Sequence, residues 1–217
     1  MSLIKALVSP VTPFQQNAPI LFCEESKKCA FVDPGGDLDI LLGAAKDNDL
    51  IPEKIFLTHG HADHAGAAME LASMLSIEIE GPHHEDAFLL ESLESQGKMF
   101  GMHAQNCIPN RWLLDGDEVH LGNEILQVLF CPGHTPGHQP LKLVPENFGR
   151  LVLSGDLYHF EISRQLRRTP VFNTDAEETL RSMNRVEVLT QEAGATFWME
   201  HSLELANSLN LAPYYYD

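Results

Sequence analysis

The chain has 217 residues, 44% of them hydrophobic, and a formal net charge of −17 from 31 acidic and 14 basic residues. This negative charge repels phosphate backbones and anionic head groups, which argues against nucleic acid and membrane surfaces as partners. No apolar run approaches the ~20 residues of a membrane span and no secretory signal pattern stands at the N-terminus, so we expect a cytoplasmic protein. Length and apolar content predict a single globular domain over residues 1–217.

Short apolar runs alternate with longer helical patterns, which favours an α/β or α+β layered fold. Five of the runs end at or near a side chain of a type that binds metals. In chain order these are Asp33 in CAFVDPGG, His59 in KIFLTHGH, His134 in LQVLFCPGH, Asp156 in LVLSGD and His201 in ATFWMEH. Because adjacent strands can deliver side chains from their ends to one edge of a scaffold, we expect these residues to converge.

Helices are predicted between these runs. The segment AGAAMELASMLS directly after His64 is expected to be helical, with the polar residues before it in a strand-to-helix loop. DAFLLESLESQGKMF, residues 86–100, has apolar residues at three- and four-residue spacing and is predicted as one helix. DAEETLRSMNRVEVLTQEAG has the same spacing and is predicted to begin at an Asp175 cap and to stop at Gly194.

The stretch LTHGHADHAGA places His59, His61, Asp63 and His64 within six positions. In an extended loop, His59 and His61 project to the same side, whereas Asp63 and His64 start the next turn and can point elsewhere. Four ligands this close together cannot all bind one ion without strain. The spacing therefore favours two adjacent metal ions.

Each ion then needs ligands from distant segments. We predict that His134 joins His59 and His61 at one ion, that His201 joins the other pair, and that Asp156 bridges both. Imidazole and carboxylate without thiolate suit two divalent metal ions, foremost zinc, with iron or manganese as alternatives. Structural zinc sites usually recruit cysteine, so this set of ligands favours an open, catalytic centre.

Two further residues are expected near this centre. His138 follows His134 by four residues in a tight loop, and we predict that it makes a supporting hydrogen bond near the metals. For Asp33 two interpretations stay open: it orients a ligand histidine, or it caps the turn of DPGG.

The remaining histidines and the cysteines are predicted to have no part in metal binding. His83 and His84 are expected to start or cap a helix, and His103 and His120 to lie on the surface or in loops. The cysteines have no CxxC spacing and are predicted to be reduced thiols; they are Cys23, Cys29, Cys107 and Cys131.

The pattern HxHxDH at residues 59–64, the glycine-flanked His134 in CPGHTPGH, Asp156 in SGDLYH and the late His201 resemble the metallo-β-lactamase superfamily. This resemblance implies an α/β fold of four layers, the αββα sandwich, in which two mixed sheets pack face to face with helices outside.

Two parts of the chain resemble different subfamilies. Residues 1 to about 138 resemble the compact bacterial type of glyoxalase II, a hydroxyacylglutathione hydrolase, in PVTPFQQNAPI, FVDPGGD, LTHGHADHAGAA, GPHHEDAFLLESL, KMFGM and PNRWLLDGDEVHLG. After a seam near residues 138–141, GDLYHFEISRQLRRTPVFNTD, SMNRVEVL, MEHSLE and LAPYYYD resemble lactonase-like hydrolases, which include N-acyl homoserine lactone lactonases. No glutathione-binding residues carry over, because the region that holds them in larger glyoxalase II enzymes has no counterpart here.

The resulting expectation is metal-dependent hydrolysis of an activated carbonyl, with Asp63 also orienting the attacking water-derived nucleophile. Tyr158 or His159 is predicted to hydrogen-bond a developing oxyanion. One of three arginines is predicted to meet a substrate carboxylate: Arg164, Arg167 or Arg168.

A small-molecule glutathione thioester is the first substrate choice, a lactone the second and a β-lactam the third. The alternatives from other classes are an iron-dependent persulfide dioxygenase and a non-catalytic metal-binding protein. The protein is expected to be a monomer or a homodimer. The terminal PYYYD is predicted to pack on the core, with a dimer contact or the pocket mouth as alternatives.

Overall fold

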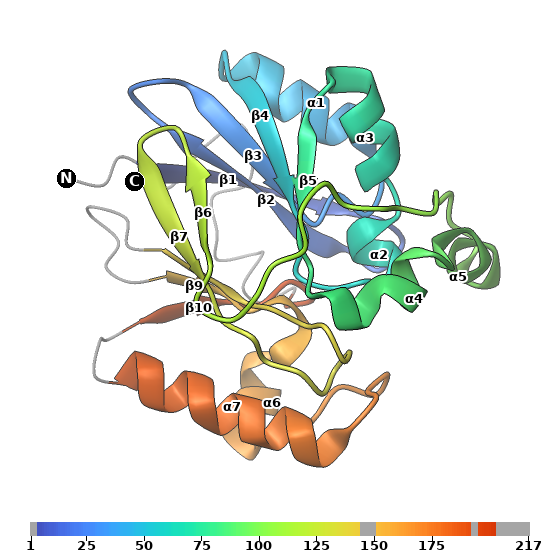
Figure 1. Ribbon diagram of the computed structural model, residues 1–217, viewed down its shortest axis with the longest axis vertical. Helices are drawn as coiled ribbons and strands as arrows, with labels where there is room; N and C mark the ends of the chain where they lie inside the picture. The colour runs from blue at the N-terminus through green and yellow to red at the C-terminus, as the bar shows by residue number, and fades with distance from the viewer. Residues whose placement is uncertain (1–3, 144–150, 192–194, 203–217) are drawn as a thin grey trace.

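Two mixed β-sheets pack face to face, and helices cover their outer faces (Figure 1). The computed structural model describes residues 4–143, 151–191 and 195–202. The predicted helix stop at Gly194 and the terminal PYYYD lie outside these residues. The predicted αββα sandwich is confirmed.

The first sheet contains, side by side in chain order, β1 (Ile4–Val11), β2 (Gln16–Cys23), β3 (Lys28–Val32), β4 (Ile51–Phe56) and β5 (Glu78–Glu80). β1, β2 and β3 are antiparallel neighbours, whereas β3, β4 and β5 are parallel. Parallel neighbours need a crossover connection. Helix α1 (Leu38–Asp47) connects β3 to β4, and helices α2 (Ala62–Ala65) and α3 (Ala68–Leu75) connect β4 to β5.

The second sheet has the order β10-β9-β8-β7-β6. Its strands are β6 (Glu118–Leu121), β7 (Glu124–Val128), β8 (Leu141–Leu143), β9 (Leu151–Leu153) and β10 (Thr196–Trp198). β6 to β9 are antiparallel neighbours, and β10 is parallel to β9. Between β9 and β10 the described residues form the 3-10 turn η2 (Gly155–Leu157) and the helices α6 (Glu161–Leu166) and α7 (Ala176–Gln191).

Side chains that alternate along β1 build two of the core layers. Leu7 and Val11 belong to the cluster that includes α1 residues, whereas Ile4, Ala6 and Val8 belong to the cluster between the two sheets. This period of two is expected for a strand whose two faces are both covered. Each fully buried side chain of this size stabilises the fold by about 1.5–3 kcal/mol.

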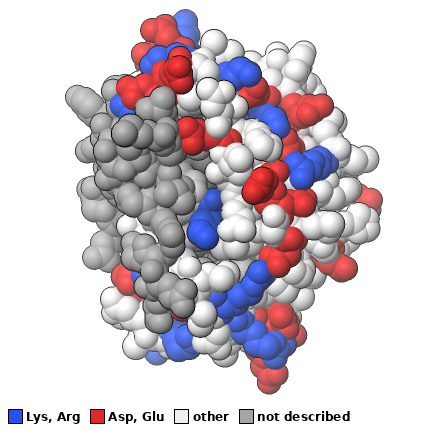
Figure 2. All heavy atoms as spheres, turned by 60° about the vertical axis from the view of Figure 1, so that its left-hand side comes forward, with Lys and Arg blue, Asp and Glu red and all other residues white. Residues whose placement is uncertain are grey.

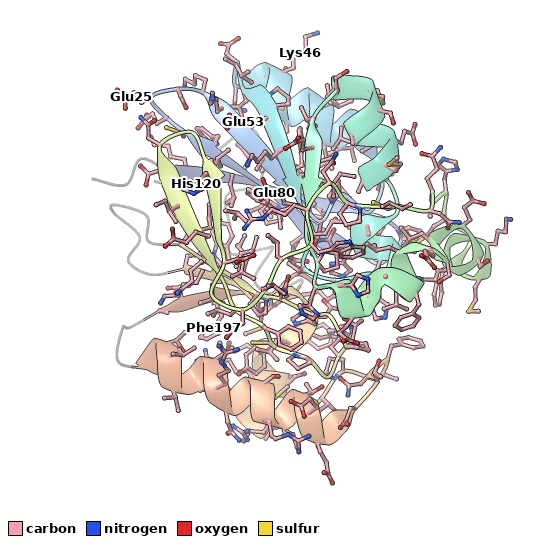
Figure 3. The ribbon with its side chains drawn as sticks, in the orientation of Figure 1. Glu25, Lys46, Glu53, Glu80, His120 and Phe197 are labelled. Carbon is pink, nitrogen blue, oxygen red and sulfur yellow. The ribbon has the colours of Figure 1, made fainter. Side chains whose placement is uncertain are left out.

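Helix α7 covers the outer face of the second sheet. Met183 and Val186 of α7 share a buried cluster with Phe197 of β10, which lies beside the helix (Figure 3). At the helix start, the backbone N–H of Glu178 donates to Asp175 Oδ1 at 2.9 Å, so the predicted Asp175 cap is confirmed.

The segment of the chain between β5 and β6 differs from the prediction of one helix over residues 86–100. It forms a 3-10 turn η1 (His84–Asp86), α4 (Ala87–Leu90) and α5 (Leu93–Phe100). The Ser92 hydroxyl donates to the Leu89 carbonyl at 3.0 Å, and the Gln96 side chain donates to the same carbonyl at 2.9 Å. These side chains take an acceptor that a continuous helix would use for its backbone, which explains the break.

The surface shown in Figure 2 carries acidic and basic side chains interspersed with one another. Among the described residues they form pairs such as Lys28 with Glu53 at 2.5 Å and Arg111 with Asp117 at 3.1 Å. Such exposed pairs contribute about 0–1 kcal/mol each. Within the ranges that the structure covers, no helix is long and apolar enough to cross a membrane.

The four cysteines are buried and form no disulfide, as predicted for reduced thiols. Burial raises the pKa of three of these thiols to about 12; they are Cys29, Cys107 and Cys131.

Candidate metal centre

The segments that follow strands of both sheets bring the predicted ligand residues to one place. His59 and His61 follow β4, and His134 follows β7. Asp156 lies in η2 after β9, and His201 follows β10. The convergence expected from the strand ends is therefore present in the structure.

Asp63 and His64 lie in helix α2 and not in the loop where the sequence pattern placed them. The helix begins early because the His64 and Ala65 backbone N–H groups both donate to the His61 carbonyl, at 3.1 and 2.8 Å. The His64 ring is fully buried, whereas Asp63 is partly exposed.

A first group of imidazole nitrogens meets at short distances. His61 Nδ1 is 3.1 Å from His59 Nε2 and 3.0 Å from His134 Nε2. The ligand atoms of these three residues and of Asp156 all lie within 4.8 Å of one another. This is the first of the two ligand sets that the spacing predicted.

The second group is built around His64 and His201, whose Nε2 atoms are 3.2 Å apart. Asp63 Oδ2 lies 3.4 Å from His201 Nε2 and 3.6 Å from His64 Nε2. The structure thus brings together the three residues that the sequence assigned to a second ion. Their role as ligands remains a prediction.

Asp156 faces both groups with one carboxylate. Its Oδ2 lies 3.3 Å from His134 Nε2 and 3.4 Å from His201 Nε2, and its Oδ1 lies 3.5 Å from His64 Nε2. Oδ1 is buried and makes no hydrogen bond within the described part of the chain. A buried carboxylate oxygen without a donor is costly unless a cation faces it.

The first group fits a divalent ion by its geometry. Zinc binds imidazole nitrogen at about 2.0–2.1 Å, so tetrahedral ligands are about 3.3 Å from one another. The observed nitrogen separations of 3.0 and 3.1 Å are close to that edge. A hydrogen bond between two imidazole nitrogens uses one proton, which only one of the two nitrogens can carry. Three nitrogens that converge in a buried site therefore suit a metal ion better than hydrogen bonds to one another.

The two groups differ in protonation. Burial lowers the pKa of His61 to about 4, and it lowers the pKa of His59 and His134 well below the ordinary value. These rings are neutral at pH 7, which is the form that binds a metal. In the second group burial also lowers the pKa of both imidazoles, but the carboxylates around them together outweigh it, Asp156 and Asp63 above all. They raise the pKa of His201 to about 10 and that of His64 well above its ordinary value.

Asp33 contacts His64, one of the predicted ligands, which favours the first of its two interpretations. Its Oδ2 lies 3.0 Å from His64 Nδ1, and its Oδ1 accepts the Thr58 backbone N–H at 2.7 Å. His138 Nε2 accepts the backbone N–H of Asp156 at 3.1 Å, which is the supporting hydrogen bond that the sequence predicted.

Sequence reasoning missed Glu200, the residue before His201. The Glu200 side chain is buried, and its Oε2 lies 2.9 Å from His64 Nδ1. Gln16 Nε2 donates to the same oxygen at 3.0 Å. An acidic residue at the end of the buried strand β10 was the available signal, because carboxylates are rarely buried without a partner.

A pocket of about 600 Å³ opens above the two groups. Its floor includes the ligand-type residues His61, Asp63, His134, Asp156 and His201. Its walls are mainly apolar, and their residues include Phe14, Phe100, Phe160, Val171 and Phe172. The Phe100 ring centroid lies 5.5 Å from that of Phe14 and 6.2 Å from that of Phe172. No Lys, Arg, Ser or Cys is among the described residues that line the pocket.

The position of Tyr158 does not support its predicted hydrogen bond to a developing oxyanion. Tyr158 is 1% exposed and its hydroxyl donates to Glu187 Oε1 at 3.1 Å, under helix α7 and outside the pocket wall. The neighbouring His159 does line the pocket, and its Nε2 lies 2.9 Å from Asp156 Oδ2.

The predicted role of the three arginines in binding a substrate carboxylate is also not supported by their positions. Arg164 Nε donates to Glu187 Oε1 at 2.7 Å and its guanidinium lies 4.2 Å from the centre of the Phe197 ring. Arg167 donates to Asn184 Oδ1 at 2.7 Å, and Arg168 is exposed. None of the three lines the pocket.

The other histidines have the structural positions that were predicted. His83 caps η1, because its Nδ1 accepts the backbone N–H of Glu85 at 3.3 Å, and His84 is the first residue of that turn. His103 is exposed in a loop, and His120 is exposed on β6, away from the ligand groups (Figure 3).

An αββα sandwich that gathers His and Asp side chains where strands of both sheets end is the architecture of a metal-dependent hydrolase. Residues 11–193 match the sequence model of the Metallo-beta-lactamase superfamily, and the chain belongs to this superfamily.

Three similar proteins differ in their identity to the chain and in the share of it that they cover. It is 41% identical over 133 residues to the hydroxyacylglutathione hydrolase GloC of Haemophilus influenzae, a match that spans 60% of this chain and 62% of that protein, less than two thirds of its length. The structure of TTHA1623 in a di-iron-bound form superposes with a TM-score of 0.72 and 27% identity, over 90% of this chain and 91% of that one. A quorum-quenching N-acyl homoserine lactone lactonase superposes with a TM-score of 0.73 and 20% identity, over 100% and 99% of the two chains, which shows a common fold.

Proposed function

We propose that the protein is a dinuclear metal-dependent hydrolase that cleaves an activated carbonyl compound. The observation that carries this proposal is the pair of His/Asp groups that share Asp156 on the floor of the pocket. When bound there, two divalent ions, foremost zinc, would supply Lewis acidity towards a carbonyl oxygen and would activate water near neutral pH.

The residues of the chain divide the work of holding these ions. The first ion would be held by His59, His61 and His134, and the second by Asp63, His64 and His201. Asp156 faces both groups and would bridge them. At His64, Nδ1 lies 3.0 Å from the Asp33 carboxylate, so Nδ1 would keep its proton and Nε2 would bind the ion.

Two pocket residues are assigned to the reacting groups. The Asp63 carboxylate lies on the pocket floor, where it would orient the attacking water. His159 lies beside Asp156 in the wall and would donate a hydrogen bond to an oxyanion. Because the described pocket lining contains no serine or cysteine, water is the nucleophile that this arrangement favours.

A glutathione thioester is the first candidate substrate. Its support is the 41% identity to the hydroxyacylglutathione hydrolase of Haemophilus influenzae. The charge of the site is compatible with an anionic substrate, because two divalent ions carry +4 and the carboxylates of Asp63 and Asp156 carry −2, which leaves +2. This excess attracts an acyl oxygen that gains negative charge.

A lactone with an apolar acyl chain is the second candidate, and the pocket wall favours it. Phe14, Phe100 and Phe172 offer aromatic surface, and the described lining has no Lys or Arg to pair with the carboxylates of glutathione. Apolar surface that an acyl chain covers stabilises the complex by about 25 cal/mol per Å². The wall therefore suits an alkyl group better than a charged tripeptide.

Steady-state hydrolysis of S-lactoylglutathione and an N-acyl homoserine lactone, measured side by side with zinc-loaded protein, tests the proposal. We expect the thioester to have the higher kcat/KM. A higher value for the lactone would replace the first candidate by the second. Two bound ions with no turnover of thioester, lactone or β-lactam would support the non-catalytic alternative. Oxygen uptake on glutathione persulfide by iron-loaded protein would support the dioxygenase.

A further inference from the structure

Asp86 is a buried carboxylate that the proposed mechanism does not use. It is the last residue of η1, its exposed fraction is 0%, and it does not line the pocket. Three donors point at its two oxygens: the Gly60 N–H at 2.9 Å, the Thr135 hydroxyl at 2.7 Å and the Gly137 N–H at 2.6 Å. Burial raises the pKa of Asp86 to about 6, so the group is ionised at pH 7.

The first donor belongs to the loop of the first sheet that carries two predicted ligands. Gly60 lies between His59 and His61, so a hydrogen bond to its backbone N–H constrains the backbone that carries both histidines. Its hydrogen bond to Asp86 Oδ2 holds this part of the loop against the start of α4.

The other two donors belong to the loop of the second sheet. Thr135 and Gly137 directly follow His134, the third imidazole of the first group. Their hydrogen bonds to Asp86 hold this loop against the same carboxylate. One side chain therefore joins the two loops whose imidazoles converge on the first site.

The two glycines permit this close approach. A Cβ at Gly137 would lie 2.7 Å from Asp86 Cγ, and a Cβ at Gly60 would lie 3.2 Å from the Asp86 carbonyl oxygen and 2.7 Å from Leu89 Cβ. Real Cβ atoms are almost never found as close as 2.7 Å to another heavy atom. Glycine at both positions is thus what lets both loops reach the carboxylate.

We propose that Asp86 is a positioning residue that fixes the separation between the His59–His61 loop and His134, and so sets the affinity of the first metal site. The inference rests on the proposed function in one respect, since it assumes that the first group binds a divalent ion. Loss of a residue that supports a ligand typically lowers metal affinity 10–100-fold. The expected effect is confined to one of the two ions.

The test is Asp86→Asn, which keeps the shape of the side chain but sets an N–H₂ group against N–H and O–H donors. The affinities for two cobalt ions are measured by competition with a chelator. One ion should bind about 10–100-fold more weakly and the other unchanged. The cobalt spectrum of the remaining ion should match that of the His61→Ala protein, in which the first group itself is broken.

Asp115→Asn is the matched control. Asp115 also accepts a backbone N–H, that of Phe130 at 2.9 Å, and it pairs with Arg185 at 2.8 Å. It contacts the His134 loop only at Phe130, four residues before His134, and it makes no hydrogen bond to the loop of the first sheet. It should leave both cobalt affinities unchanged. Hydrogen exchange of the Gly60 and Gly137 amides in the metal-free protein gives a second readout, and both should exchange faster in Asp86→Asn.

Should Asp86→Asn fail to fold, Thr135→Val removes one of the three donors and should weaken the same ion by a smaller factor. Unchanged affinity of both ions in a folded variant would overturn the inference, as would an equal loss at both sites together with a lower melting temperature. Hydrolysis is not the readout. A wild-type protein that binds two ions without turnover would sink the proposed function alone, whereas one that binds no ion would overturn both.

Discussion

Replacement of Asp156 by asparagine tests the shared ligand of the two proposed sites. The carboxylate lies 3.3 Å from His134 Nε2 in the first group and 3.4 Å from His201 Nε2 in the second. Asparagine has nearly the same shape, but it offers one neutral oxygen in place of two charged ones. The charge of the loaded site would rise from +2 to +3, and one of the two ions would lose a ligand.

The size of the effect follows from this position. A residue that only supports a ligand contributes about 10–100-fold to metal affinity. A shared direct ligand should contribute more, so we expect Asp156→Asn to lower affinity by at least about 100-fold. This factor equals about 3 kcal/mol, at 1.4 kcal/mol for each factor of ten.

The assay measures bound metal by elemental analysis after dialysis, and hydrolysis of the preferred substrate on the same samples. Metal content and turnover should fall together. Asp117→Asn is the control, because Asp117 accepts the Leu114 backbone N–H at 3.0 Å and lies outside the residues that line the pocket. It should retain both. Unchanged metal stoichiometry and rate in Asp156→Asn would refute the shared-ligand assignment.

Three further predictions follow from the geometry and from the pKa shifts. Tyr158→Phe should leave turnover unchanged and lower the melting temperature by about 2–4 °C, because it removes the hydrogen bond to Glu187, worth about 1 kcal/mol. A tenfold loss of kcat with unchanged stability would contradict this expectation. Phe172→Ala should raise KM for long-chain acyl substrates by no more than about tenfold, since its side chain is 65% exposed, whereas Phe88→Ala, outside the pocket, should not change KM. The pKa of His201 is raised to about 10 and that of His64 well above its ordinary value, so the second ion must displace at least one proton. Its affinity should therefore rise at least about 100-fold from pH 6 to pH 8 in chelator competition, whereas the affinity of the first group, with the pKa of His61 at about 4, should vary little. Equal pH dependence at both sites would be inconsistent with this assignment.

The ligand groups could be predicted because their signals are local. A strand ends at a defined residue, and side chains two apart in an extended segment point to one side, which paired His59 with His61. The distant partners His134 and His201 followed from the number of ligands that each ion needs. The helical position of Asp63 was missed, but the prediction did not depend on it, because residues in the next turn point elsewhere in either conformation.

The choice between Tyr158 and His159 could not be made from the sequence. Tyr158 has extended backbone angles, φ −134° and ψ 127°, so neighbouring side chains point to opposite faces of the segment. Which of the two faces the pocket depends on how α7 packs on the second sheet. Once Glu187 of α7 lies over the segment, the tyrosine hydroxyl has a partly buried acceptor there and the histidine is left on the pocket side.

The pocket wall was also beyond the sequence, since Phe14, Phe100 and Phe172 come from three distant segments and each would pass for a core residue. The role of Asp86 could not be predicted from the sequence either. In the sequence it is an acidic residue near the start of a helix, where a favourable interaction with the helix dipole is its ordinary role. Only the approach of two loops from opposite sheets gives its carboxylate another role.

The measurement that tests the central claim most directly is a titration of metal-free protein with zinc, in which hydrolysis of the preferred substrate is followed against equivalents of metal added. The account predicts activity that rises until two equivalents are bound and then stays constant. A plateau at one equivalent, or metal binding at two equivalents without hydrolysis, would contradict a dinuclear hydrolytic centre.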